Sequence, residues 1–259
     1  MPYQTEMFYQ VTDPAGTLTA LTALASPTIS TSGTNLQVGE NSQIVSLIAG
    51  VPSGGGGYIQ IRAPSLLQYA RQYVPGNGNT DADAYIDNPP LFQDLINNPL
   101  DMVTTEDMEA YSDSNTTSNE ANWLLVNFAD NIAEPPQGPT RTVRATMTST
   151  LVADAWDNQS IAFDDNLPAG RYSVTGMRAV GATLVAARLV FQNQAARPGV
   201  PGLQADNNVN PYIFEPGGGL GSFGEFESTN PPSVDCLATT TLADVDLYLT
   251  LVQVRSGPG

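Results

Sequence analysis

The sequence contains no histidine and no lysine, and all nine of its cationic residues are arginines. Without histidine there is no Ser-His-Asp triad, no Cys-His pair and no imidazole ligand for a metal. Without lysine there is no Schiff-base residue and no phosphate-loop lysine. Carboxylates are the only groups left for acid–base chemistry or metal binding, and we therefore expect the chain not to be an enzyme.

Positive charge is scarce, because nine arginines face 26 acidic residues and the formal net charge is −17. Binding to nucleic acid depends largely on cations that neutralise phosphates, so we expect no direct contact with DNA or RNA. Charged residues make up only 14% of the chain, against roughly 25% in ordinary soluble proteins. Much of the surface should therefore be neutral and polar, or covered by neighbouring subunits.

Cysteine is nearly absent as well. The single Cys236 excludes an internal disulfide, and we expect it to be a small buried apolar residue. The first residues, MPYQTEMFYQVTDP, lack a basic segment followed by an apolar run, so we expect no signal peptide and synthesis in a cytoplasm. No window reaches the roughly 18 apolar residues of a membrane-spanning helix.

Short apolar stretches, separated by 23 glycines and 20 prolines, dominate what is present. In Val245–Val254 (VDLYLTLVQV) apolar and polar residues alternate, which is typical of a half-buried strand. Helical patterns are confined to Pro64–Tyr73 and a short turn at Pro90–Asn97. The chain should be all-β, a sandwich or jelly roll with one or two short helices in loops. The other predicted strands are Met7–Thr12, Thr17–Leu24, Gln43–Val51, Tyr58–Arg62, Trp123–Phe128, Val143–Val152, Ser160–Asp164, Arg171–Val180, Leu184–Phe191 and Phe223–Glu227.

A proline-rich segment, Ala133–Arg141 (AEPPQGPTR), divides the chain almost in half. Proline does not continue the interior of a strand, so this segment is the best candidate for a linker. We expect an N-terminal sandwich over residues 1–134 and a C-terminal sandwich over residues 135–259.

The two halves resemble each other in sequence. Tyr58–Gly76 aligns without a gap on Leu184–Gly202 at an offset of 126, with seven identities in nineteen positions. Upstream, Ser42–Val51 aligns on Arg171–Val180 at an offset of 129, and the difference falls in a glycine-rich turn, where a repeat tolerates insertions. We therefore predict a duplicated domain. Superposition of its halves should place Arg62 on Arg188 and Pro75 on Pro201.

Clusters of aspartates are the candidate sites. Asp81 and Asp83, and Asp164 and Asp165, offer the oxygen ligands that Ca²⁺ takes from loops, so we consider a structural calcium ion between subunits and otherwise no cofactor. A carboxylate-based glycosidase would instead need two such groups across a cleft. Solvated loop carboxylates are the simpler interpretation.

The arginines recur at matching places in both halves, as Arg62 with Arg188 and Arg71 with Arg197. In a chain so poor in cations, these side chains should form bidentate pairs with carboxylates, within or between subunits. We expect Arg71 and Arg197, which lie near Gly/Pro-rich loops, to contribute to a subunit interface.

Leu167–Gly202, Gly217–Ser228 and Val245–Val254 have the look of a phage coat domain. With two tandem sandwiches and few charges, the chain resembles the double jelly-roll major capsid proteins of tailless icosahedral, membrane-containing bacteriophages. The resemblance implies two tandem jelly rolls and trimers that form pseudo-hexagonal capsomers of an icosahedral shell. It also implies a place in the virion beside other virion proteins and an internal lipid membrane.

Three alternatives remain open, and one of them is the carboxylate-based glycosidase described above. The chain could be a minor capsid or spike protein of the same kind of virus. It could also be a carbohydrate-binding β-sandwich module, whose ligand face would be formed by Tyr58, Tyr69, Tyr73 and Tyr85.

Overall fold

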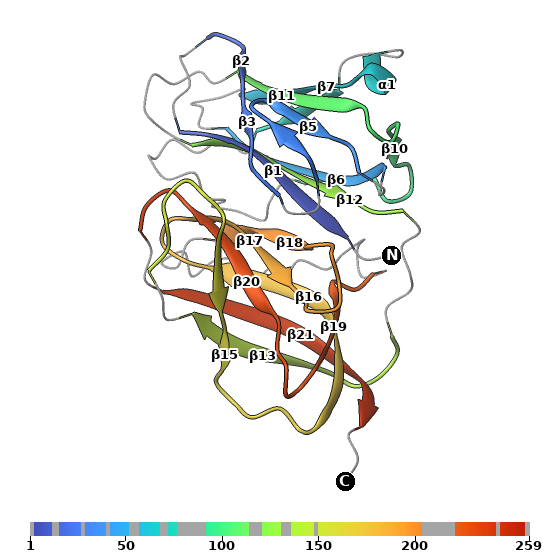
Figure 1. Cartoon of the computed structure of the whole chain (residues 1–259), viewed down its shortest axis with the longest axis vertical. Coiled ribbons are helices and arrows are strands. Elements are labelled where there is room, and N and C mark those ends of the chain that lie inside the picture. The colour runs from blue at the N-terminus through green and yellow to red at the C-terminus, as the bar shows by residue number, and fades with distance from the viewer. Residues whose placement is uncertain are drawn as a thin grey trace. The chain divides into compact units, whose positions relative to one another are not determined.

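In the computed structural model, the regular secondary structure of the described residues is almost entirely β-strand (Figure 1). Its one helix, α1 (Pro64–Leu67), is a single turn. Among these residues no helix is long and apolar enough to cross a membrane. The described residues are 3–11, 16–26, 29–39, 42–51, 57–67, 72–76, 92–113, 121–130, 136–147, 150–203, 221–241 and 244–256.

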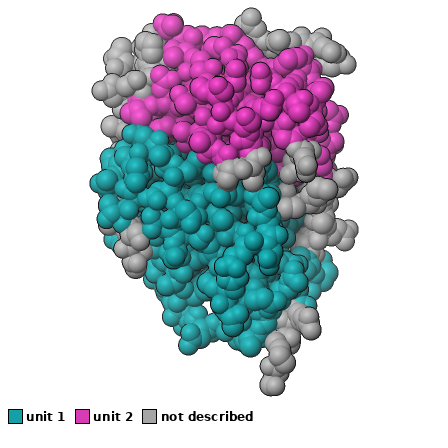
Figure 2. Space-filling view, in the orientation of Figure 1, with its two compact units in different colours: residues 1–5, 131–259 teal, residues 6–130 magenta. Residues whose placement is uncertain are grey.

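The chain forms two compact units, coloured separately in Figure 2. Unit 2 comprises Glu6–Asp130, and unit 1 comprises Asn131–Gly259 together with Met1–Thr5. The sequence-based boundary at residues 134 and 135 lies four residues further along the chain. The sequence-based division also placed residues 1–5 in the N-terminal half, whereas in the structure they belong to the unit formed by the C-terminal half.

Among its described residues, unit 2 contains two six-stranded sheets. One has the order β10-β6-β12-β1-β3, with β9 also on β6, and the other has the order β4-β5-β11-β7-β8, with β2 on β11. The strands are β1 (Gln4–Gln10, which starts in unit 1), β2 (Thr19–Ala20), β3 (Thr22–Ala23), β4 (Thr31–Ser32), β5 (Asn35–Gln37), β6 (Gln43–Gly50), β7 (Tyr58–Arg62), β8 (Gln72–Pro75), β9 (Phe92–Asp94), β10 (Leu100–Asp101), β11 (Asp107–Asp113) and β12 (Asn122–Phe128).

In unit 1, β16 pairs with β21 and β19, and β21 pairs with β13, which carries β15 on its other edge. The order β14-β20-β17-β18 forms the second layer, which is joined to β16 by a short parallel pairing of β18. The strands are β13 (Thr140–Met147), β14 (Asp157–Ser160), β15 (Ala162–Phe163), β16 (Gly170–Val180), β17 (Leu184–Val190), β18 (Gly199–Leu203), β19 (Gly224–Glu227), β20 (Ser233–Ala238) and β21 (Val245–Ser256).

Both units have the strand order of a jelly roll. When the eight principal strands of each unit are numbered along the chain, one sheet reads 1-8-3-6 and the other reads 2-7-4-5. In unit 2 these sheets are β1-β12-β6-β9/β10 and β5-β11-β7-β8, and in unit 1 they are β13-β21-β16-β19 and β14-β20-β17-β18. The chain is therefore all-β with two tandem jelly rolls, as predicted.

Burial follows the predicted alternation. In β21, Val245, Leu247 and Leu249 are at most 1% exposed, whereas Asp246 and Tyr248 between them are partly exposed. The same period of two puts Met108 and Ala110 of β11 into the core of unit 2. A strand buries one face because successive side chains point to opposite sides of the sheet.

The predicted repeat agrees with the structure in the fourth strands and is wrong in register for the fifth, and the structure adds the seventh strands, which the prediction did not include. Arg62 of β7 pairs with Glu109 of β11, and Arg188 of β17 pairs with Asp235 of β20, so both pairs keep the offset of 126. The fifth strands, β8 and β18, are equivalent in order. However, Pro75 lies opposite Tyr58, whereas Pro201 lies opposite Ala186, which is a shift of two residues. A register irregularity in β17 between Leu184 and Ala186 accompanies this shift.

Both helical predictions need correction. α1 ends at Leu67 and β8 starts at Gln72, inside the predicted helix Pro64–Tyr73, whose residues 68–71 lie outside the described residues. Within Pro90–Asn97, Phe92–Asp94 is a strand paired with β6. In both places the hydrogen bonds of a neighbouring strand outweigh local helix propensity.

Candidate functional site

The predicted aspartate sites are only partly within the described residues, since Asp81 and Asp83 lie outside them. Asp164 forms an ion pair of 2.8 Å with Arg144, which also binds Asp246 at 2.8 Å. Hydrogen bonds to Asp164 and then to Asp246 raise the pKa of the guanidinium. Asp165 is exposed. Within the described ranges no three acidic or cysteine side chains are grouped to hold a metal ion, and calcium binding stays a prediction.

Only one of the two predicted interface residues lies within the described residues. Arg71 lies outside the described residues. Arg197 lies just before β18, and its guanidinium forms an ion pair with Asp235 of the same chain. Its side chain is 23% exposed. A role for Arg197 between subunits stays a prediction, but its charge is already paired within unit 1.

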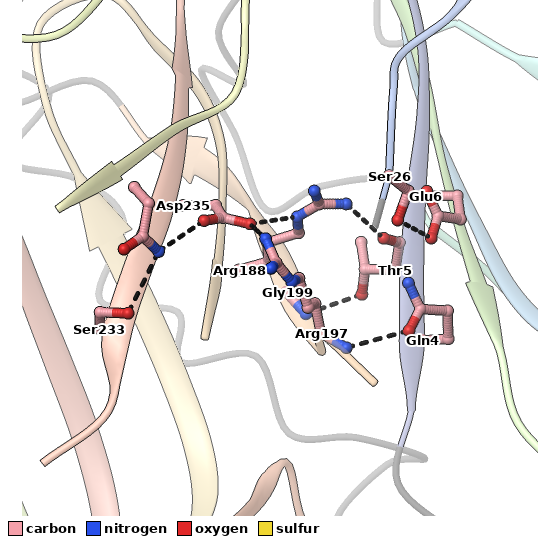
Figure 3. Close-up of polar contacts among 10 residues, drawn as sticks. Gln4, Thr5, Glu6, Ser26, Arg188, Arg197, Gly199, Ser233 and Asp235 are labelled. Atoms are coloured by element: carbon pink, nitrogen blue, oxygen red, sulfur yellow. Dashed lines mark hydrogen bonds and ion pairs between the residues drawn. The ribbon is translucent and has the colours of Figure 1, made fainter. Parts of the chain in front are cut away.

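A buried network centred on Asp235 is the most unusual polar feature of unit 1 (Figure 3). Arg188 Nε donates a hydrogen bond to Asp235 Oδ2 at 2.9 Å, and Arg197 binds the same oxygen. The side chains of Arg188 and Asp235 are 1% and 2% exposed. Asn158 donates to the other carboxylate oxygen at 2.7 Å. Three donors therefore surround one carboxylate that is almost shielded from solvent.

The N-terminal residues complete this network, as Figure 3 also shows. Arg188 Nη1 donates to the carbonyl oxygen of Thr5 at 3.3 Å, and the Thr5 hydroxyl accepts the backbone N–H of Gly199 at 2.7 Å. The backbone N–H of Thr5 donates to the carbonyl oxygen of Arg197 at 3.0 Å, and that of Arg197 donates to Gln4 Oε1 at 3.0 Å. These contacts explain why residues 1–5 belong to unit 1.

An aromatic ring covers the remaining face of the buried guanidinium. Arg188 lies over the ring of Trp156, with 4.1 Å from the guanidinium carbon to the ring centroid. A cation over an indole ring is attracted by the negative face of that ring. Three types of partner, a carboxylate, a carbonyl oxygen and an aromatic face, thus offset the cost of taking Arg188 out of water.

This arrangement is suited to holding segments together rather than to proton transfer. Asp235 accepts hydrogen bonds on both oxygens and is not available as a base. Next to it, burial raises the pKa of the Cys236 thiol to about 12, with smaller contributions from the charges of Asp235 and Asp157. The thiol therefore stays protonated near neutral pH and is a poor nucleophile.

Sequence reasoning found Arg188 but missed Asp235, Trp156 and Thr5. A signal for Asp235 was present, because Glu109 lies 126 residues before it in the corresponding strand of the repeat. The sequence contained no comparable signal for Thr5, because Arg188 and Gly199, which it contacts, are far from it along the chain.

The equivalent position in unit 2 has different contacts. Arg62 stacks on Tyr111, with 3.8 Å from the guanidinium carbon to the ring centroid, and its Nε donates to Gln60 at 2.7 Å. Gln60 in turn donates to the Tyr73 hydroxyl at 3.0 Å. Tyr73 is 47% exposed. Unlike Arg188, Arg62 has no carboxylate within ion-pair distance among the described residues, although Glu109 lies opposite it.

Of the tyrosines predicted to form a ligand face, two are described. The rings of Tyr58 and Tyr73 make an edge-to-face contact, with centroids 5.3 Å apart and planes inclined by 67°. Tyr69 and Tyr85 lie outside the described residues.

The strand orders define a protein of the double jelly-roll class. No protein-family model matches the chain, and no curated protein matches it. Among solved structures, it is similar to one described as "Crystal Structure of the STIV MCP". That similarity covers 96% of this chain and 97% of the other, with 11% identity and a TM-score of 0.28. Such a distant likeness carries no weight, and the fold assignment depends on the strand order alone.

Proposed function

We propose that this chain is a major capsid protein, a structural subunit that assembles into trimers and then into an icosahedral shell. The observation that carries the proposal is the presence of two successive jelly rolls with the same strand order in one chain. Three copies around a threefold axis would present six similar sandwiches, which is the number needed to fill a hexagonal position. Closed rotational symmetry is the usual arrangement of identical subunits.

The composition supports this proposal. A shell subunit covers much of its surface with neighbours, which suits a chain with only 14% charged residues. The buried network around Asp235 holds strands together, and both oxygens of its carboxylate accept hydrogen bonds. The net charge of −17 fits contact with other virion proteins or a lipid layer better than contact with naked genome. The virion of a membrane-containing bacteriophage, made in a host cytoplasm, remains the proposed setting.

The test is the mass of the purified protein in solution. We expect light scattering coupled to size exclusion to give three times the 27.4 kDa of one chain, and electron microscopy to show triangular or hexagonal particles. A protein that stays monomeric at all concentrations, including those that drive shell assembly, would contradict the proposal. Trimers that form only spikes or fibres in reconstituted particles would favour the minor capsid alternative.

One observation favours a second candidate, a carbohydrate-binding module. The contact between Tyr58 and Tyr73, of which Tyr73 is 47% exposed, places aromatic rings beside the polar groups of Gln60 and Arg62. Sugars bind to surfaces of this kind because their C–H faces stack on rings. A monomer that binds a glycan panel, and loses that binding in Tyr73→Ser, would replace the capsid proposal.

A further inference from the structure

The two jelly rolls hold an arginine at the same register, but among the described residues only one of these arginines has a carboxylate partner. Arg188 lies opposite Asp235 and bonds to it at 2.9 Å, whereas Arg62 lies opposite Glu109 without an ion pair. The Glu109 carboxylate instead accepts the hydroxyl of Tyr111 at 3.0 Å. Within the described residues, the charge of Arg62 is therefore left without a counterion.

The guanidinium of Arg62 is nevertheless held in place. Its plane lies against the ring of Tyr111, and its Nε is bound to Gln60. Gln60 is only 1% exposed and is held in turn by the Tyr73 hydroxyl. The guanidinium also interacts with the Tyr111 hydroxyl, but among the described residues it forms no ion pair with a carboxylate. A guanidinium fixed on an aromatic ring is preorganised to bind a carboxylate with two parallel hydrogen bonds.

The surroundings of Arg62 are those of a protein interface. Tyr58, Gln60, Arg62, Tyr73 and Tyr111 occupy one face of the β8-β7-β11 layer, opposite to the side on which Ile59, Ile61 and Ala110 enter the core. We refer to these five residues as the Arg62 face. Tyrosine and arginine are enriched in interfaces and among the residues that contribute most to their affinity.

We propose that the Arg62 face binds a second copy of this chain, and that a carboxylate of that copy pairs with Arg62. The chain has 26 carboxylates and only nine cations, so an identical neighbour offers many partners of the required charge. Arg188, at the equivalent position in unit 1, provides a precedent within the same chain. There a segment of the chain, Gln4–Thr5, lies against Arg188 and supplies an acceptor.

This inference names the contact by which the proposed shell subunits recognise each other, and it therefore rests on the proposed function. The first test compares Arg62→Gln with Arg141→Gln. Arg141 is an exposed arginine of β13 with no ion pair among the described residues, so its replacement removes the same charge from the surface. Sedimentation velocity over a range of concentrations measures the assembly of each variant, and thermal melting checks that each is folded.

We expect Arg62→Gln to raise the concentration needed for assembly by about tenfold or more, which corresponds to one charge-assisted pair across an interface. Arg141→Gln should assemble like the unmodified protein. Tyr73→Ser provides a second variant on the same face and should also weaken assembly. If the unmodified protein assembles and all three variants assemble equally well, the Arg62 face is not an interface, while the capsid proposal stands. If the unmodified protein is monomeric, both proposals fail together.

The second test identifies the partner. A photo-crosslinking phenylalanine at position 73 is placed in chains labelled with ¹⁵N, which are mixed with unlabelled chains before assembly. We expect cross-linked peptides that join labelled to unlabelled segments, with an acidic residue near the cross-link. Cross-links confined to labelled peptides of one molecule would overturn the inference. Loss of glycan binding in Arg62→Gln, with assembly unchanged, would also overturn it and assign the face to a carbohydrate.

Discussion

Replacement of Asp235 by asparagine tests whether the buried network stabilises unit 1. The change keeps the shape of the side chain but removes the charge that faces Arg188, whose side chain is 1% exposed, and Arg197, which is 23% exposed. Loss of one partner from a buried ion pair leaves an uncompensated charge away from water and costs about 3–5 kcal/mol. For a unit of about 130 residues this corresponds to a drop of roughly 10–18 °C in Tm.

The measurement is urea unfolding followed by tryptophan fluorescence. Trp156 reports on unit 1 and Trp123 on unit 2, and the chain has no other tryptophan. The matched control is Glu225→Gln, which removes a carboxylate from an ion pair of 2.7 Å with Arg171 in the same unit. That pair is exposed, with side chains 52% and 37% accessible, so its loss should cost less than about 1 kcal/mol.

A second substitution separates electrostatics from general damage. Arg188→Met in the Asp235→Asn background removes the stranded charge and keeps much of the side-chain volume, so it should restore at least about 1 kcal/mol. The reasoning fails if Asp235→Asn is no more destabilising than Glu225→Gln. It fails equally if the double variant is less stable than Asp235→Asn alone.

Three further predictions concern other contacts of unit 1 and the packing of the sheets. Thr5→Val should cost about 1–3 kcal/mol, because the buried N–H of Gly199 loses its acceptor, whereas Thr5→Ser should retain most of the stability in the same urea assay. Burial favours the protonated thiol of Cys236, so the contribution of this group to stability should be constant below its ordinary pKa of 9.0 and fall as the pH rises toward about 12. At pH 8 a thiol reagent should label it only on unfolding, and rapid labelling of the native protein would contradict its burial. Gly202→Ala should lower Tm, because its Cβ would lie 2.1 Å from a backbone oxygen of β17, whereas Gly39→Ala meets only ordinary contacts at 3.5 Å and should not.

Part of the fold could be predicted from the sequence. The alternation in Val245–Val254 predicts a half-buried strand, and β21 has that pattern. The recurrence of Arg62 at Arg188 predicted equivalent strands, and the pairings of β7 with β11 and of β17 with β20 agree. These features are local, or repeat at a constant spacing, and both kinds of pattern survive in a linear sequence.

Other features depend on partners that are distant along the chain. The helical pattern of Pro64–Tyr73 gave way to strand at Gln72, because β8 completes its hydrogen bonds on β7. The order of strands in each sheet depends on which strands, distant along the chain, pair with each other and bury their apolar faces together. No single stretch of sequence determines that order.

The alternation of short apolar strands determined the all-β class from the sequence alone, and the absence of histidine and lysine removed the residues that catalytic triads and Schiff bases require. Only the tertiary structure determined which partners Arg62 and Arg188 have. It brought Thr5 and Asp235 to Arg188, and it left Arg62 on Tyr111 without a carboxylate among the described residues. The reason is physical: a charge acquires its partner through burial and strand register, which arise when distant segments meet.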